Sequence, residues 1–266
     1  MVTLHPVTDL RSLLDLEAVK PDAFLGASPR LGWHRIYGGQ VVAQALMAAS
    51  RTVESGHLPH SLHAYFIRAG DERQPVLYEV ERVRDGRSFM TRQVVAYQEG
   101  GAILNLIASF HEPEGGADVQ SIVAPTVAGP ETGERWGSDL FFEHRVLGRW
   151  RDPQAGARGW MRAVDDLGDD PILHACAFAY LSDEDALGAA LTAHPLSFEW
   201  ERMMAASLDH AIWFHRPLRA DDWLLFDLAG YGVADARGLA TVQVYDQRGV
   251  HVASVAQEAL GRERTA

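Results

Sequence analysis

A short, mainly apolar segment, residues 207–217, contains one carboxylate and two imidazoles. Its sequence, Ser-Leu-Asp-His-Ala-Ile-Trp-Phe-His-Arg-Pro, is rich in residues that favour strands, and Pro217 ends the run. An ionised carboxylate is costly to bury in such a strand unless it has hydrogen-bond partners or a raised pKa. Asp209 is therefore a candidate general base. The alternative is a structural carboxylate that caps a turn at the start of the strand.

A second candidate, Gln257, lies near the end of the last strand-like run, residues 252–258. In an antiparallel meander this strand can neighbour the one that begins at Asp209, so a carboxylate and an amide from distant parts of the chain can meet. A carboxylate that accepts a proton and an amide that orients a water can hydrolyse a substrate without a covalent intermediate. The alternative is that Gln257 is an ordinary polar residue at a strand end.

Other common kinds of site are not indicated by the sequence. It contains no Gly-x-Ser-x-Gly elbow, no His-Glu-x-x-His motif and no phosphate-binding loop. His57, His60 and His63 resemble a metal site, but in a strand His60 and His63 point to opposite faces, and His57 lies roughly 20 Å from His63. The single cysteine, Cys176, has apolar neighbours, as expected for a structural thiol. We expect no metal and no cofactor.

The composition is that of an acidic globular protein. The 266 residues are 47% hydrophobic, and 24 basic side chains stand against 36 acidic ones, a net charge of −12. Such a chain has no general attraction for nucleic acid or for an anionic membrane surface. No apolar run approaches the roughly 20 residues of a membrane span. Because the first six residues resemble no signal or transit peptide and there is only one cysteine, we expect a cytoplasmic protein.

The elements that must position the candidate residues recur in two halves. In the first half, a helix rich in small apolar residues is predicted over 40–50, followed by a meander of antiparallel strands between 61 and 110. In the second half, Asp170-Pro171 begins a helix over 172–181, and residues 182–185 resemble the start of another. Further strands are predicted between 208 and 258.

The two halves repeat one unit. His63-Ala64 recurs as His210-Ala211, 147 residues later (63 to 210), and the order of elements and turns is the same. The sequence therefore predicts an α+β double hotdog, with two β-helix-β-β-β-β units that each wrap a long central helix in an antiparallel sheet. We place the N-terminal hotdog at 1–112, a Pro- and Gly-rich linker at 113–138, and the C-terminal hotdog with the candidate site at 139–266.

Seven motifs resemble, in the same order, those of the bacterial acyl-CoA thioesterase II family, whose members are double-hotdog proteins. The resemblance covers residues 25–262, and the motifs lie at 36–40, 66–70, 84–89, 179–183, 208–217, 236–238 and 252–258. It implies an enzyme that hydrolyses fatty acyl-CoA to a free acid and CoA, with acyl-CoA as its partner. It also implies a homo-oligomer. The alternative is a non-hydrolytic acyl-CoA binding protein that keeps the fold and has lost turnover.

In that family an Asp, a Thr or Ser, and a Gln hold the water that attacks the thioester carbonyl. The resemblance assigns the Asp to Asp209 and the Gln to Gln257. Residues 224–236, where the hydroxyl side chain is expected, contain no Ser or Thr, and counting without gaps from Trp223 puts Tyr231 in its place. Tyr231 either supplies the missing hydrogen bond or blocks the site. We expect it to block the site, because a longer side chain mimics a short hydroxyl poorly.

The start of the first central helix, at Gly38, Gly39 and Gln40, is the candidate oxyanion site. Backbone N–H groups at a helix N-terminus can stabilise the negative oxygen that develops during attack on a thioester. The alternative is that the two glycines are needed only for close packing of the helix.

Arginine must supply the contacts to the phosphates of CoA, because Lys20 is the only lysine. Arg84, Arg87 and Arg237 flank turns in the family-like motifs, and they are the candidates. The alternative for each is a solvated surface charge or a pair with one of the excess acids.

Overall fold

The computed structural model describes residues 6–30, 32, 34–136, 140–147, 157–197 and 199–264. Their contacts form two compact units: unit 1 contains residues 1–117 and 165–180, and unit 2 contains residues 118–164 and 181–266. Helix α3 (Pro171–Leu181) thus lies almost wholly in unit 1, whereas its place in the sequence repeat puts it with the C-terminal half. The predicted limit between residues 138 and 139 lies outside the described residues, so the domain limits stay a prediction.

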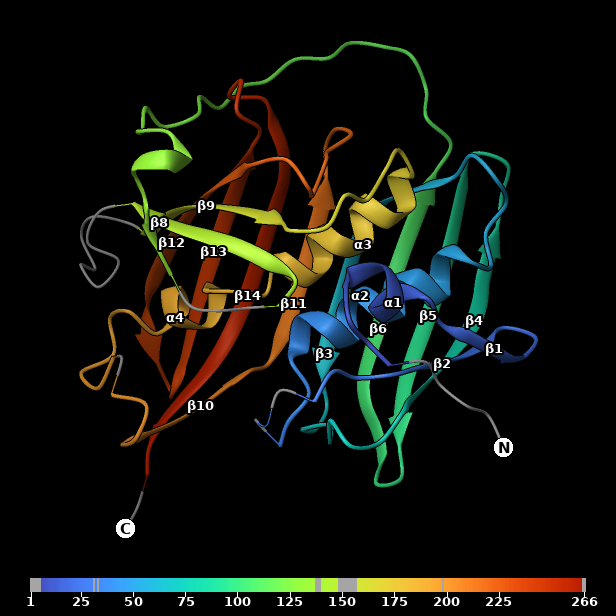
Figure 1. The fold of residues 1–266 in the computed structure, drawn as a ribbon, viewed down its shortest axis with the longest axis horizontal. Coiled ribbons are helices and arrows are strands. Elements are labelled where there is room, and N and C mark those ends of the chain that lie inside the picture. The colour runs from blue at the N-terminus through green and yellow to red at the C-terminus, as the bar shows by residue number, and fades with distance from the viewer. Residues whose placement is uncertain are drawn as a thin grey trace. The chain divides into compact units, whose positions relative to one another are not determined.

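Unit 1 contains an antiparallel sheet and the predicted helix α2 (Gly38–Ser50), shown in Figure 1. The strand order is β1-β2-β4-β5-β6-β3. The other elements are α1 (Leu10–Leu14), β1 (Glu17–Lys20), β2 (Ala23–Gly26), β3 (Leu58–Phe66), β4 (Val76–Asp85), β5 (Phe89–Gln98) and β6 (Gly101–His111). Helix α2 is buried from Gly39 to Ala49, because its small residues let strands and helices approach on every side.

Helices α2 and α3 lie side by side and antiparallel within unit 1. At one end the rings of Tyr37 and Tyr180 pack edge to face with centroids 4.9 Å apart, and the Tyr37 hydroxyl donates to the Tyr180 carbonyl oxygen at 3.1 Å. At the other end Arg51 and Asp170 line one cavity of about 670 Å³. Cys176 of α3 is fully buried, and burial raises the pKa of its thiol, as expected for a structural residue.

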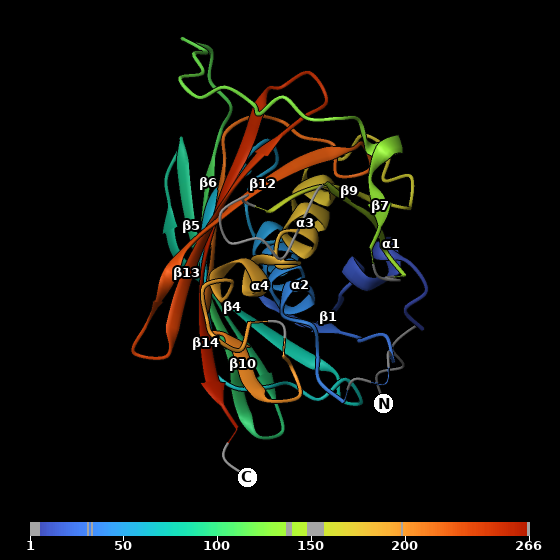
Figure 2. The same cartoon turned by 90° about the vertical axis from the view of Figure 1, so that its left-hand side faces the viewer.

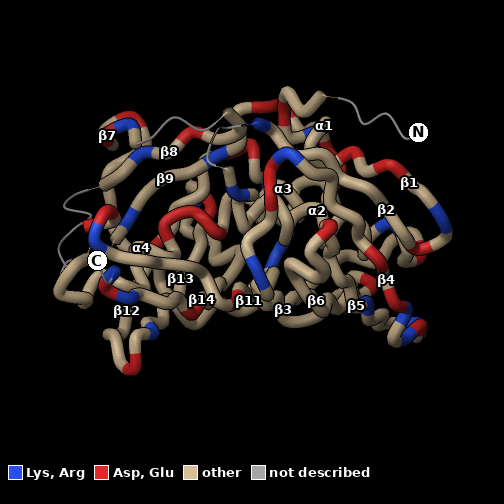
Figure 3. The backbone as a smooth tube through the Cα atoms, turned by 90° about the horizontal axis from the view of Figure 1, so that it is seen from below, with Lys and Arg blue, Asp and Glu red and all other residues tan. Residues whose placement is uncertain are grey.

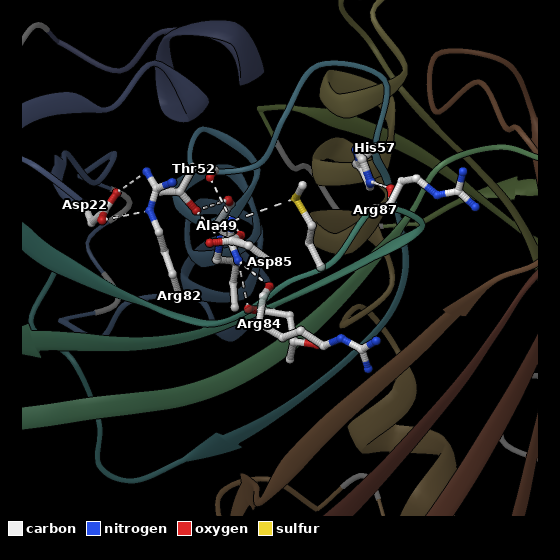
Figure 4. A network of polar contacts seen from close by, with 11 residues as sticks. Asp22, Ala49, Thr52, His57, Arg82, Arg84, Asp85 and Arg87 are labelled. Atoms are coloured by element: carbon white, nitrogen blue, oxygen red, sulfur yellow. Dashed lines mark hydrogen bonds and ion pairs between the residues drawn. The ribbon is translucent and has the colours of Figure 1, made fainter.

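A buried arginine ties the end of α2 to the β4–β5 hairpin (Figure 4). The guanidinium of Arg92 donates to Thr52 at Oγ1 (2.7 Å) and at the carbonyl oxygen (2.9 Å), to the Arg84 carbonyl oxygen (2.9 Å) and to Asp85 Oδ1 (2.5 Å). Thr52 Oγ1 in turn donates to the carbonyl oxygen of Ala49 at 2.8 Å. Arg92 is fully buried, and a buried guanidinium is tolerated only when its donors are satisfied in this way.

Unit 2 contains a second antiparallel sheet, with strand order β11-β14-β13-β12-β9-β8-β7 and with β10 also paired to β14. Its elements are η1 (Pro130–Thr132), β7 (Glu134–Arg135), β8 (Phe142–Leu147), β9 (Ala157–Ala163), α4 (Ala186–Ala190), β10 (Met203–Ser207), β11 (Asp209–Phe214), β12 (Leu224–Ala234), β13 (Arg237–Tyr245) and β14 (His251–Glu263). The further helix predicted to begin at Ser182 is the short α4, which begins after Asp185.

Helix α4 lies against β12, β13 and β14, as Figure 2 shows. A Cβ atom on Gly230 would overlap the carbonyl oxygen of Ala189, and one on Gly238 would overlap that of Ala190. These two strand positions must therefore be glycine for the helix backbone to lie directly on the sheet.

The predicted α+β double hotdog is confirmed. The order β-helix-β-β-β-β occurs twice along the chain, as β2-α2-β3-β4-β5-β6 and as β9-α3-β11-β12-β13-β14, with α4 and β10 added in the second copy. Both predicted central helices, α2 and α3, are buried along almost their whole lengths.

Charged residues are distributed over both units. Figure 3 shows acidic and basic positions interspersed along the backbone of each unit. No helix among the described residues is long and apolar enough to cross a membrane.

We expect Arg92→Met to lower the free energy of unfolding by about 2–4 kcal/mol, because buried carbonyl oxygens lose their donors. The matched control is Arg82→Met on the neighbouring strand β4. The Arg82 side chain is 47% exposed and pairs with Asp22. The free energy of unfolding of this control should fall by at most about 1 kcal/mol, as for other surface ion pairs. Urea denaturation followed by circular dichroism measures both changes. Equal losses would show that the buried network has no special weight.

Candidate active site

Asp209 lies at a β-bulge beside β14. Ser207 pairs with Ala259 and Ala211 with Ala256, so the β10–β11 strand has one more residue between these pairs than β14 has. A bulge of this kind changes the direction of a side chain and is common beside active sites. The half-buried carboxylate accepts a hydrogen bond at Oδ1 from the backbone N–H of Glu258 at 2.7 Å. This bond fixes one carboxylate oxygen on β14.

Gln257 is fully buried, and its amide is bonded at both ends. Its Oε1 lies 2.5 Å from Nδ1 of His210, and its Nε2 donates to Oγ of Ser207 at 2.8 Å. On the far side of the imidazole, Nε2 of His210 lies 2.8 Å from Oγ of Ser182. We call these four side chains, Ser182, His210, Gln257 and Ser207, the amide network. All of them belong to unit 2.

The structure brings Asp209 and Gln257 to adjacent places on two paired strands. Asp209 precedes His210, which contacts the Gln257 amide, and Gln257 precedes Glu258, whose N–H binds Asp209. Strands β11 and β14 are neighbours, as the sequence indicated. A carboxylate and an amide are thus held within two residues of each other in the sheet.

Tyr231 lies on a different face of the sheet from the Gln257 side chain. Thr241 pairs with Ala256 while its neighbour Ala240 pairs with Gln257, so the side chains of Thr241 and Gln257 point to opposite faces. Tyr231 is 66% exposed, and its hydroxyl lies 2.8 Å from Oγ1 of Thr241. This contact supports neither of the two roles considered for Tyr231, which stay predictions.

On β12, the position in line with Gln257 is Gly230. Gly230 pairs with Ala240, which in turn pairs with Gln257. No hydroxyl side chain fits at this position, because a Cβ there would overlap the Ala189 carbonyl oxygen. The hydroxyl that contacts the Gln257 amide comes instead from Ser207 of β10.

The start of α2 is tightly packed. A Cβ on Gly39 would overlap the carbonyl oxygen of Tyr180, so the packing alternative accounts for this glycine. Gln40 is 2% exposed, and its Nε2 donates to Oγ of Ser28 at 2.7 Å, so its side chain has a structural partner. A role of the backbone N–H groups of Gly38, Gly39 and Gln40 at an oxyanion stays a prediction.

The three candidate phosphate-binding arginines differ in their partners. Arg84 and Arg87 flank the exposed turn of the β4–β5 hairpin, and Figure 4 shows both guanidinium groups extending away from the Arg92 network. Neither forms an ion pair with a residue in the described ranges. Arg237 lies 3.4 Å from Asp235 and 3.5 Å from Glu258. An anion must compete with two carboxylates for Arg237, whereas Arg84 and Arg87 are open to it.

A cluster of His144, Glu184 and Asp185 in unit 2 has the spacing of a metal site, with its ligand atoms all within 4.8 Å of one another. The side chains of His144 and Asp185 are 1% and 6% exposed, and Nε2 lies 3.2 Å from Oδ2. Burial lowers the pKa of His144 to about 4 and raises the pKa of Asp185. Both shifts favour the neutral forms of the two side chains.

This pair has a testable effect on stability. Between about pH 4 and 6.5 the unfolded chain binds one proton on His144, which the folded imidazole lacks. The raised pKa of Asp185 lets the folded carboxyl hold a proton at low pH, and this proton offsets the pH dependence there. In Asp185→Asn neither His144 nor the new Asn binds a proton in the folded state. The free energy of unfolding should then fall by about 1.4 kcal/mol per pH unit as the pH decreases from 6.5 to 4. Urea denaturation across this range measures the slope. Identical slopes for wild type and variant would contradict the neutral pair.

A comparison of this fold with solved structures indicates the class of protein. The structure is similar to the crystal structure of an acyl-CoA thioesterase II from Mycobacterium marinum, with a TM-score of 0.83, 36% sequence identity and coverage of 97% of this chain and 98% of that one. The double-hotdog fold is therefore shared with a protein of this class.

The sequence comparisons then give the family. Family models match residues 28–111 (Acyl-CoA thioesterase N-terminal domain) and 148–260 (Acyl-CoA thioesterase). Acyl-CoA thioesterase 2 of Haemophilus influenzae is 33% identical over 96% of this chain and 98% of its own length. Human acyl-coenzyme A thioesterase 8 is 34% identical over 97% of this chain and 91% of its own length. The chain belongs to the acyl-CoA thioesterase II family.

Proposed function

We propose that this protein hydrolyses fatty acyl-CoA to a free acid and CoA, with Asp209 as the general base and Gln257 orienting the water. Membership of the acyl-CoA thioesterase II family supports the reaction and the substrate class. The observation that carries the choice of residues is the hydrogen bond from the Glu258 N–H to Asp209, which holds the carboxylate one residue from Gln257.

The proposed reaction uses one water and no covalent intermediate. Asp209 removes a proton from the water as its oxygen attacks the thioester carbonyl, which gives a tetrahedral intermediate. The carbon–sulfur bond then breaks, the thiolate of CoA takes up the proton that Asp209 accepted, and the acyl group leaves as a carboxylic acid. Gln257 hydrogen-bonds to the water and so limits its orientation before attack.

We expect Asp209→Asn to lower kcat by about 10²- to 10⁴-fold, because Asn is nearly isosteric but cannot accept the proton. Release of free thiol from a panel of acyl-CoA substrates measures the change. The matched control is Asp227→Asn on β12 of the same sheet, where the carboxylate pairs with Arg158 at 2.6 Å. If Asp209→Asn retains most of its turnover, Asp209 is not the base.

The same assay on the wild-type protein tests the alternative reading. A non-hydrolytic acyl-CoA binding protein would bind the substrate and release no thiol. No feature of the described residues favours this alternative.

For CoA binding we propose Arg84 and Arg87 as the main phosphate contacts. Replacing both by Ala should raise the KM for acyl-CoA several-fold and weaken its dependence on salt, because two cations that attract the phosphates are removed. The matched control is Arg237→Ala, which should have a smaller effect, since that arginine lies between two carboxylates. Unchanged KM and salt dependence in the double variant would exclude this site.

Three further proposals concern the whole protein. A cytoplasmic location is supported by the single cysteine, and a homo-oligomer by the family resemblance. The Pro- and Gly-rich composition of residues 113–138 supports a linker between hotdog domains 1–112 and 139–266. Light scattering after size-exclusion chromatography tests the oligomer, and limited proteolysis within 113–138 tests the linker.

A further inference from the structure

We propose that Ser182 and His210 are positioning residues that hold the side-chain amide of Gln257 in one of its two orientations. The inference rests on the proposed function, in which Gln257 orients the attacking water. It adds two residues that touch neither the water nor the substrate and act through the amide.

Three of the four side chains of the amide network are closed to solvent, and they come from separate elements. Ser182 follows α3, His210 lies on β11 and Gln257 on β14, and these three side chains are at most 1% exposed. Three hydrogen bonds join the network, from Ser182 to His210 (2.8 Å), from His210 to Gln257 (2.5 Å) and from Gln257 to Ser207 (2.8 Å). Such a buried network leaves its members few alternative partners.

The direction of every bond follows from the chemistry of the groups. Because Nε2 of Gln257 donates to Ser207, the amide presents Oε1 to His210. A carbonyl oxygen only accepts, so Nδ1 of His210 must carry a proton. A neutral imidazole carries one proton, so its Nε2 accepts a hydrogen bond from the hydroxyl of Ser182. The hydrogen bond to Ser182 holds the imidazole in place, and the Nδ1–H of His210 holds Oε1 of the amide.

The orientation matters because it decides what Gln257 offers to a water. One hydrogen on Nε2 binds Ser207, and the other can bind the oxygen of the water. That oxygen keeps a second lone pair for the attack, and its proton remains available to Asp209. A reversed amide would present Oε1 instead, and this oxygen would accept a water hydrogen in competition with Asp209.

Removing the Ser182 hydroxyl should therefore reduce catalysis without removing a catalytic group. In Ser182→Ala the imidazole of His210 loses its hydrogen bond at Nε2, so the ring and the amide that it contacts are held less firmly in one orientation. We expect kcat to fall about tenfold with little change in KM, because misorientation of a group in the site affects the chemical step more than binding. Ser182→Thr, which keeps a hydroxyl, should restore most of the loss.

A matched control removes a serine hydroxyl that also contacts an imidazole. Ser254 lies on the same strand as Gln257, and its Oγ is 2.9 Å from Nε2 of His215, outside the amide network. Ser254→Ala should keep the wild-type kcat. A double-mutant cycle with Gln257→Ala separates positioning from general damage. If Ser182 acts through the amide, Ser182→Ala has no further effect once Gln257 is Ala, whereas additive losses would overturn the proposal.

Nitrogen-15 NMR of the histidine side chains tests the network without any substrate. The His210 resonances are identified by their loss in His210→Gln, and we expect the Nδ1–H tautomer in the wild-type protein. An Nε2–H tautomer, or an unchanged kcat in Ser182→Ala, would overturn the inference. Failure of the proposed function looks different: the wild-type protein would release no thiol from any acyl-CoA, while the Nδ1–H tautomer would still show that the network fixes the amide.

Discussion

The backbone pairing of β11 with β14 is the constraint on which the candidate site depends. It places Asp209 and Gln257, which are far apart in the sequence, next to each other. The bulge at Asp209 allows its carboxylate to accept a hydrogen bond from the Glu258 N–H. A shift of one residue in the pairing would turn the side chains of one strand to the other face and separate the two groups. The register of this one strand pair therefore decides whether the carboxylate and the amide lie next to each other.

Most of the fold could be predicted from the sequence because its signals are local and repeated. The small-residue run that forms α2 and the 147-residue repeat of His63 at His210 are visible without any structure. The packing of α4 on the sheet could not be predicted. It depends on glycines of β12 and β13, and the sequence does not show that a helix lies directly on them. From the sequence, Arg92 would be predicted to be an exposed charge in a strand. Only the tertiary structure shows that it is buried among hydrogen-bond acceptors.

The residue types of Asp209 and Gln257 singled them out, whereas Ser182, His210 and Ser207 were not chosen although they lie in or beside the quoted motifs. A hydrogen-bonded network depends on register and burial, which a motif does not show. Tyr231 was chosen by counting residues without gaps from Trp223. The pairing of β12 with β13 is irregular between Gly230 and Val233, so counting does not show to which face of the sheet a side chain points there.

The close contact of α4 with Gly230 also has an evolutionary consequence. A hydroxyl side chain on β12 in line with Gln257 cannot arise by a single substitution at Gly230, because its Cβ would overlap the Ala189 backbone. The helix would have to move first, and a substitution in the strand could follow. The order of such mutations is thus fixed by steric contact. Lineages that keep α4 in this position must therefore keep glycine at 230.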